Sequence, residues 1–297
     1  MADLNFIDIL NTIVLISIMF GVGTSLTIND FKHLSRHPRA WVIGMVLQML
    51  WLPVIAFLIA WLAPLSDAYK VGLFILALCP GGTTSNFVSF LVDANVALSI
   101  SLTTVNSFLI LFTIPFFANL GLEFFLSEQA ESSFSLPVGE TAIQVFGIIL
   151  TPALLGFLYR RYRDINAQKV QQFFKWINLI LLAVVYSVKF FFGEQSGGSG
   201  ISWSEVWAIL PFALLLHLLT MFSSYWIART RSDLSRLDAT TIGIEVGLQN
   251  TTLALLITAT LIGNEEMSKP ALVTAVFAFF TTVTWSYLNL RLGRSEN

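Results

Sequence analysis

A single glutamate lies deep within an apolar stretch of this chain. Glu245 belongs to DATTIGIEVGLQNTTLALLITATLIG, residues 238–263, a segment long enough to cross a bilayer. A carboxylate at the centre of a membrane helix costs about 2.5–3.5 kcal/mol on insertion scales. No lysine or arginine is expected at the same depth, which leaves either a protonated, hydrogen-bonded carboxyl group or a carboxylate that binds a cation. The sequence favours the bound cation.

Neutral oxygen ligands accompany this glutamate in the sequence. The candidates are Ser85, Asn86, Gln249, Asn250 and nearby backbone carbonyls. Ser99 and Thr103 add two hydroxyl groups, and their i, i+4 spacing puts both on one face of a helix. Hard oxygen ligands suit Na⁺ and similar cations better than transition metals, which favour imidazole or thiolate. These residue types therefore predict a site for Na⁺ or another hard cation, whereas a proton would not need so many neutral oxygens.

Two further polar residues lie inside apolar segments, and each has two interpretations. His217, in LLLHLLTMF, is either a neutral packing residue with hydrogen bonds or a proton relay. Gln48, in MVLQMLWLP, either bridges two helices or gives an oxygen to a cation. An intramembrane enzyme would need a second acid, a nucleophile with its base, or a metal cluster within the spans. Glu245 and His217 each stand alone, so the chain is not expected to be an enzyme.

The elements that must position these residues are predicted to be membrane helices. Of the 297 residues, 56% are hydrophobic and 11% are charged, against about 25% charged residues in soluble domains. Stretches of about 20–25 apolar residues are long enough to span a bilayer. We expect nine spans, over residues 6–27, 40–63, 69–92, 95–119, 138–160, 172–193, 203–228, 234–262 and 268–291. The opening MADLN lacks the basic region of a signal peptide, so the first apolar segment is expected to remain as a span.

The basic residues of the expected connections gather on one side of the membrane. Thirteen lysines and arginines fall on that side, and Lys70, Lys189 and Lys269 fall on the other. Cytoplasmic loops carry the excess of lysine and arginine in membrane proteins. We therefore expect a multi-pass protein of the cell membrane, with its N-terminus outside and its C-terminus in the cytoplasm. This topology accounts for the basic loops without nucleic-acid binding.

Two of the expected spans are interrupted near their middle. The third contains CPGGTTSN (79–86), and the eighth contains EVGLQNTT (245–252). An unsatisfied backbone group at that depth costs several kcal/mol, so it is tolerated only where protein or a water-filled cavity covers it. One such interruption is commonly a kink. A pair, with one member in each half of the chain, is typical of an inverted-repeat transporter.

Interrupted helices create binding groups of both signs. The end of the first half-helix presents carbonyl oxygens, which attract cations, and the start of the second presents backbone amides, which attract anions. A channel would instead need a ring of charges or a carbonyl filter motif, and neither is visible in the sequence. A purely structural membrane protein would not need two opened helices. The pattern therefore predicts a carrier with a cation site and an anion site side by side.

Three blocks of the sequence together resemble the bile acid:sodium symporter family. They are CPGGTTSN (79–86), NVALSISLTTV (95–105) and IEVGLQN (244–250), in the order and spacing of that family. The resemblance covers nearly all of the chain and implies an all-α inverted repeat of a panel and a core domain, with two broken helices that cross in the core. We expect one membrane unit over 1–297. Its half-repeats cover about 6–119, without the family's first helix, and about 138–292.

The resemblance also implies two sodium ions and a small organic anion as substrate. The first ion would use Ser85, Asn86, Ser99, Thr103 and Glu245, and the second Gln48, Glu245, Gln249 and the carbonyls of Val246 and Leu248. The anion, a small carboxylate or a bile-acid-like compound, is expected near Thr83, Asn250 and Thr251 at the half-helix starts. Thr281 and Thr282 stand where many relatives carry a His-Asn pair in the substrate cavity. A proton-coupled carrier that uses Glu245 and His217 is the alternative, and no obligate protein partner is expected.

Overall fold

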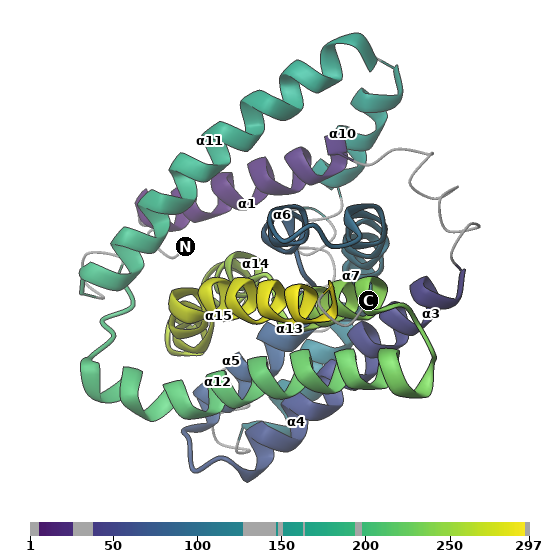
Figure 1. Cartoon of the computed structure of the whole chain (residues 1–297). Coiled ribbons are helices and arrows are strands. Elements are labelled where there is room, and N and C mark those ends of the chain that lie inside the picture. Colours follow the sequence, from purple (N-terminus) through teal and green to yellow (C-terminus); the bar gives the residue numbers. More distant parts are fainter. Residues whose placement is uncertain are drawn as a thin grey trace.

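The helices of this protein form two groups. The computed structural model of the chain describes residues 6–25, 38–126, 147, 151–162, 164–193 and 198–294, and all regular elements in these ranges are helices. Three of them, α1 (Phe6–Ser25), α10 (Thr151–Tyr162) and α11 (Asp164–Phe191), form a layer beside the others (Figure 1). Within this three-helix layer, α1 packs against both α10 and α11.

The remaining helices form a larger bundle around α5. They are α3 (Pro38–Val46), η1 (Leu47–Trp51), α4 (Leu52–Leu62), α5 (Asp67–Leu78), α6 (Thr83–Leu91), α7 (Val96–Phe125), α12 (Trp203–Trp226), η4 (Ile227–Arg231), α13 (Arg236–Gly247), α14 (Thr251–Leu256), η5 (Ile257–Leu261), η6 (Glu266–Ser268) and α15 (Lys269–Arg294). The central α5 packs against α4, α7, α14, α15 and η6, and residues 71–78 are all buried. The first interruption directly follows α5, so its position is fixed by a helix that is buried in the core of the bundle.

Four helices of the described chain are long and apolar enough to cross a membrane. They are Pro38–Leu62, Trp203–Arg231, Arg236–Ala259 and Glu266–Arg291. Each of these coincides with one of the expected spans. Of the expected fifth span, 138–160, only residue 147 and the part in α10 lie within the described residues. The helical class is thus observed directly, whereas the number of spans stays a prediction.

The basic connection expected at residues 159–169 is mostly helical. Helix α10 continues to Tyr162, and α11 already begins at Asp164 rather than at residue 172. The segment DINAQKVQQFF contains no glycine or proline, and its alanine, glutamines and lysine are good helix formers. Hydropathy indicates which part of a helix lies in lipid, not where the helix itself begins. The polar first turns of α11 were therefore not predicted.

The first interruption lies where the sequence predicts it. Helix α5 ends at Leu78 and α6 begins at Thr83. Cys79 has an extended backbone, with φ −96° and ψ 101°. The ring of Pro80 disfavours the helical conformation for the residue before it, so the proline is the local cause of the break.

The second interruption contains no proline and ends with a helix cap. Helix α13 ends at Gly247, and α14 begins at Thr251. The Oδ1 atom of Asn250 accepts a hydrogen bond from the backbone N–H of Leu253 at 3.0 Å. Asparagine is among the best residues at this capping position, because it satisfies an amide that a helix start leaves free. The restart of the helix is therefore fixed by Asn250.

Gly72 allows α5 to approach the segment before α15 closely. A Cβ atom at Gly72 would collide with the backbone carbonyl oxygen of Met267 and lie 3.0 Å from Cγ of Pro270. Backbone and a proline ring yield little, and overpacking of a core costs about 1–3 kcal/mol. We predict that Gly72→Ala lowers the melting temperature in detergent by several degrees. Gly193→Ala is the control, because its Cβ would meet nothing within 4 Å; equal melting temperatures for both variants would contradict this packing.

Candidate functional site

The two interrupted helices meet at their interruptions. The backbone N–H of Asn250 donates a hydrogen bond to the carbonyl oxygen of Cys79 at 3.2 Å. A Cβ atom on Gly82 would lie only 2.9 Å from Nδ2 of Asn250. The glycine thus allows the second interruption to lie against the first, and each supplies polar groups that the other needs.

Glu245 lies fully buried at this meeting point. Its side chain is 0% exposed, and its carboxylate contacts two hydroxyl groups of α7. Ser99 Oγ lies 3.1 Å from Oε2, and Thr103 Oγ1 contacts Oε1. A Cβ atom on Gly81 would lie 2.8 Å from Oε1 of Glu245 and 2.7 Å from Oγ of Ser85. The carboxylate is therefore enclosed by α7 on one side and by the first interruption on the other.

The oxygens around Glu245 outnumber the protons that the two hydroxyls supply. Asn86 Oδ1 lies 2.8 Å from Ser99 Oγ and 3.1 Å from Thr103 Oγ1. Each hydroxyl carries one proton, so the two protons face three acceptors, the Asn86 oxygen and both oxygens of Glu245. Ser85 is bonded to the carbonyl oxygen of Gly82, 2.9 Å away, and also to the carboxyl group of Glu245. The structure thus brings together the five side chains predicted for the first ion, with the lone-pair excess that suits a cation.

The residues predicted for the second ion include two buried amide oxygens without a partner. Gln48 and Gln249 are 3% and 4% exposed, and Oε1 of each has no hydrogen-bond partner. Nε2 of Gln249 donates to the carbonyl oxygen of Val246 at 3.2 Å, and Leu248 is the C-cap of α13. A buried acceptor without a partner costs about 1–3 kcal/mol. Both oxygens therefore have lone pairs that no group of the described structure uses.

Gln48 also lies next to the first interruption. It belongs to η1, a π-helical turn, a feature that is frequent at functional sites. Its side chain lines a small cavity together with Ala77, Leu78 and Pro80. The η1 segment also contacts α13, which carries Glu245. Gln48 thus shares a cavity with the first interrupted helix, and its η1 segment contacts the second.

His217 is bonded at both ring nitrogens. Nδ1 lies 2.8 Å from the carbonyl oxygen of Gly247, and Nε2 lies 2.8 Å from Oγ1 of Thr281. A carbonyl oxygen only accepts, so Nδ1 carries a proton. The hydroxyl of Thr281 also lies within hydrogen-bond distance of the carbonyl oxygens of Phe277 and Ala278. The fully buried Thr282 lies 3.4 Å from the same Nε2. His217 thus ties the end of α13 to α12 and α15, and both threonines are bonded to it.

Two of the predicted anion-binding residues, Asn250 and Thr251, lie at the start of α14, where an additional side chain joins them. Tyr186 of α11 places its hydroxyl 2.8 Å from Oγ1 of Thr251 and 3.3 Å from Oγ1 of Thr252. Asn250 lies beside them as the helix cap, and Thr83 is the first residue of α6. Tyr186 could not be selected from the sequence, because a tyrosine near the end of an apolar helix is an ordinary interfacial residue.

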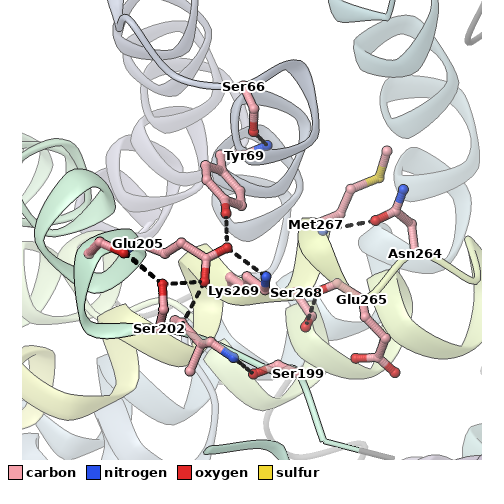
Figure 2. A network of polar contacts seen from close by, with 12 residues as sticks. Ser66, Tyr69, Ser199, Ser202, Glu205, Asn264, Glu265, Met267, Ser268 and Lys269 are labelled. Atoms are coloured by element: carbon pink, nitrogen blue, oxygen red, sulfur yellow. Dashed lines mark hydrogen bonds and ion pairs between the residues drawn. The ribbon is translucent and has the colours of Figure 1, made fainter. Parts of the chain in front are cut away.

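Two ion pairs of buried lysines also escaped the prediction. Lys189 of α11 and Lys269 of α15 are 1% and 3% exposed, although both were expected at the outer ends of spans. Lys189 pairs with Glu265, which directly precedes η6. Lys269 pairs with Glu205 at 2.7 Å, and Glu205 also accepts from the hydroxyl of Tyr69 at 2.5 Å (Figure 2). The first pair links the three-helix layer to the bundle, and the second lies within the bundle.

Known proteins with similar sequences are named as transporters or cotransporters. The rice (Oryza sativa subsp. japonica) probable sodium/metabolite cotransporter BASS1, chloroplastic, is 30% identical over 259 residues, which are 87% of this chain and 60% of that protein. The uncharacterized sodium-dependent transporter YocS of Bacillus subtilis (strain 168) is 30% identical over 80% of this chain and 70% of its own. The human ileal sodium/bile acid cotransporter is 23% identical over 91% of this chain and 74% of its own.

The chain spans 60% and 58% of the length of two rice relatives, so these are longer than the region that they share with it. The family model described as the Sodium Bile acid symporter family matches residues 12–196, which is more than half of the chain. The Bacillus relative adds a match at 30% identity over most of both sequences. On these grounds the chain belongs to the sodium bile acid symporter family.

Proposed function

We propose that this protein is a sodium-coupled symporter that takes up a small organic anion across the cell membrane by alternating access. The observation that carries the proposal is the buried carboxylate of Glu245 among the oxygens of Asn86, Ser99 and Thr103, at the meeting point of two interrupted helices. The names of the relatives, which refer to sodium with metabolites, organic anions or bile acids, support it at family level.

Two sodium ions are proposed to bind around Glu245. The first would be held by Ser85, Asn86, Ser99, Thr103 and Glu245, and the second by Gln48, Glu245, Gln249 and the carbonyls of Val246 and Leu248. An ion in the first site would take up the excess lone pairs that the two hydroxyl protons leave free. An ion in the second would give the two unpartnered amide oxygens a partner. Binding would also tie η1, α6, α7 and α13 together.

The anion is proposed to bind next to these ions, near Thr83, Asn250 and Thr251. Helix starts present backbone amides that favour negative charge. Thr281 and Thr282 remain proposed contributors to the substrate cavity, although both are bonded to His217 in this conformation. The substrate class that we propose is small carboxylates, including keto acids and pantoate-like compounds. Larger bile-acid-like compounds are the alternative substrates to test beside them.

The free energy available to drive uptake depends on how many sodium ions accompany each anion. A tenfold sodium gradient gives about 1.4 kcal/mol for each ion. Two ions carried with a monovalent anion move one net charge, which adds about 2.3 kcal/mol at 100 mV. The sum of about 5 kcal/mol supports an accumulation of several thousandfold. One ion with the same anion would move no net charge and give only about tenfold.

Alternating access is proposed to occur between the three-helix layer and the bundle, which would correspond to a panel and a core domain of an inverted repeat. The layer contacts the second interrupted helix and the segment after it through α1 and α11. Tyr186 with Thr251, and Lys189 with Glu265, are polar contacts across this boundary. Movement of the two parts would have to break them. The proposed topology has the N-terminus outside and the C-terminus in the cytoplasm.

The sodium sites predict the behaviour of Glu245→Gln. Sodium binding at about a hundred times its Kd stabilises a folded protein by about 2.7 kcal/mol, which raises the melting temperature by several degrees. We expect this rise for the wild type when NaCl replaces choline chloride, and its loss in Glu245→Gln. The matched control is Glu266→Gln, because Glu266 is exposed. A full sodium response in Glu245→Gln would remove Glu245 from the site.

The substrate class is tested by screening small carboxylates in the same assay. A transported anion is expected to raise the melting temperature in NaCl and not in choline chloride, because the ions complete its site. Stabilisation of equal size in both salts would argue against sodium coupling.

Two-ion coupling predicts that uptake is electrogenic. In proteoliposomes, an inside-negative potential should accelerate sodium-driven uptake of a carboxylate identified by the screen, because one net charge enters per cycle. Uptake that is independent of the potential would contradict a two-to-one ratio for a monovalent anion.

Alternating access predicts different effects for the two buried lysines. Lys189→Met removes the ion pair between the layer and the bundle, and Glu265, which is 30% exposed, can be hydrated instead. We expect a broader or shifted distance distribution between spin labels at positions 184 and 276 in nanodiscs. Val184 of α11 and Val276 of α15 are exposed, and the native Cys79 is buried and will not be labelled.

Lys269→Met is the matched control for this measurement. It removes an ion pair with Glu205 inside the bundle, so it is expected to lower the melting temperature while the distance distribution stays that of the wild type. Identical distributions in all three proteins would show that the Lys189 pair does not hold the layer in place.

A further inference from the structure

Asn106 is a buried amide with no hydrogen-bond partner. It lies on α7 with 0% exposure, and neither Nδ2 nor Oδ1 has a partner. Among the described residues, it is the one side chain with two such atoms. Burying unpaired polar groups is unfavourable, and nearly all buried amides in native proteins are paired. Packing alone therefore does not account for an asparagine here, because an apolar side chain would leave no polar atom unpaired.

The helical repeat directs Asn106 toward the proposed sodium sites. Ser99 and Thr103, which contact Glu245, precede it by seven and three residues on α7. Residues seven apart on an α-helix differ in direction by only about 20°. Helical side chains also tilt toward the N-terminus of their helix. The amide of Asn106 is thus directed back over the turn that carries Thr103.

The same face of α7 continues to the cavity that Gln48 lines. Ile110 and Thr113, one and two turns beyond Asn106, line this cavity with Gln48. Oε1 of Gln48 likewise has no partner. Asn106 therefore stands on α7 between the contacts of Glu245 and the neighbours of Gln48, and the Gln48 end of this stretch holds an unpartnered oxygen.

We propose that Asn106 is a sodium ligand, which gives its amide oxygen to an ion bound between Glu245 and Gln48. Oxygen is the ligand that hard cations prefer, and an ion would satisfy the oxygen that the protein leaves unpaired. The motifs that predict the other ligands do not include this position. The inference rests on the sodium sites proposed above and adds one residue to them.

The test measures two properties of Asn106→Leu, using NaCl as the only added ligand. Without sodium, its melting temperature should equal or exceed that of the wild type, because an unpaired amide is removed. The sodium concentration that gives half of the thermal shift should rise at least about tenfold, because an interaction with a charged group is worth about 1.5–3 kcal/mol. Ser286→Ala, at a buried hydroxyl of α15 that also lacks a partner, is the control and should leave this concentration unchanged.

The outcomes separate this inference from the function on which it rests. A wild-type half-saturating concentration in Asn106→Leu, together with loss of the sodium response in Glu245→Gln, would overturn the role of Asn106 alone. A sodium response in Glu245→Gln would overturn the proposed site itself. If Asn106→Leu does not fold, Asn106→Ala is measured with the same criterion. Weaker sodium binding without loss of stability supports the proposal, because a purely structural residue would change the baseline instead.

Discussion

Backbone that leaves a helix inside an apolar bundle must find new hydrogen-bond partners, and the remaining features of this site depend on how it does so. Here each interruption supplies part of what the other lacks, as in the bond from the Asn250 amide to the Cys79 carbonyl. That bond requires close approach, which the glycines at 81 and 82 permit. The bond satisfies one backbone group of each break, which lowers the cost of opening both helices at this depth.

The contact between the two breaks also determines which groups surround Glu245. Gly81 places the carboxylate beside the first break, and α7 lies on its other side with Ser99 and Thr103. Helix α7 begins directly after the turn that follows α6, and it contacts both α6 and α13. Several oxygens converge there, and no basic side chain is bonded to the carboxyl group in the described structure. Such an arrangement is more stable with a cation than without one.

The features that could be predicted from the sequence are those encoded locally. Pro80 and the glycines marked the first break, the i, i+4 spacing of Ser99 and Thr103 marked a polar face, and Glu245 was conspicuous among apolar neighbours. The partners of His217, Tyr186 and the buried lysines could not be predicted, because each contact joins helices far apart in the chain. The position of Lys189 near the end of a span is compatible with a hydrated loop, and only the packing of α11 on the bundle shows that it is buried.

The contacts inside the bundle differ in kind from those that α11 makes across the boundary between the layer and the bundle. Inside the bundle, large apolar surfaces pack together, as around α5, and such burial resists sliding because close-packed side chains interlock. Between the three-helix layer and the bundle, the contacts of α11 include a hydroxyl pair and an ion pair, Tyr186 with Thr251 and Lys189 with Glu265. Polar partners that separate can exchange their bonds for bonds to water, so the net loss is small compared with their strength in isolation. A boundary built in this way can hold one conformation and still open, which is what movement of one part against the other would require.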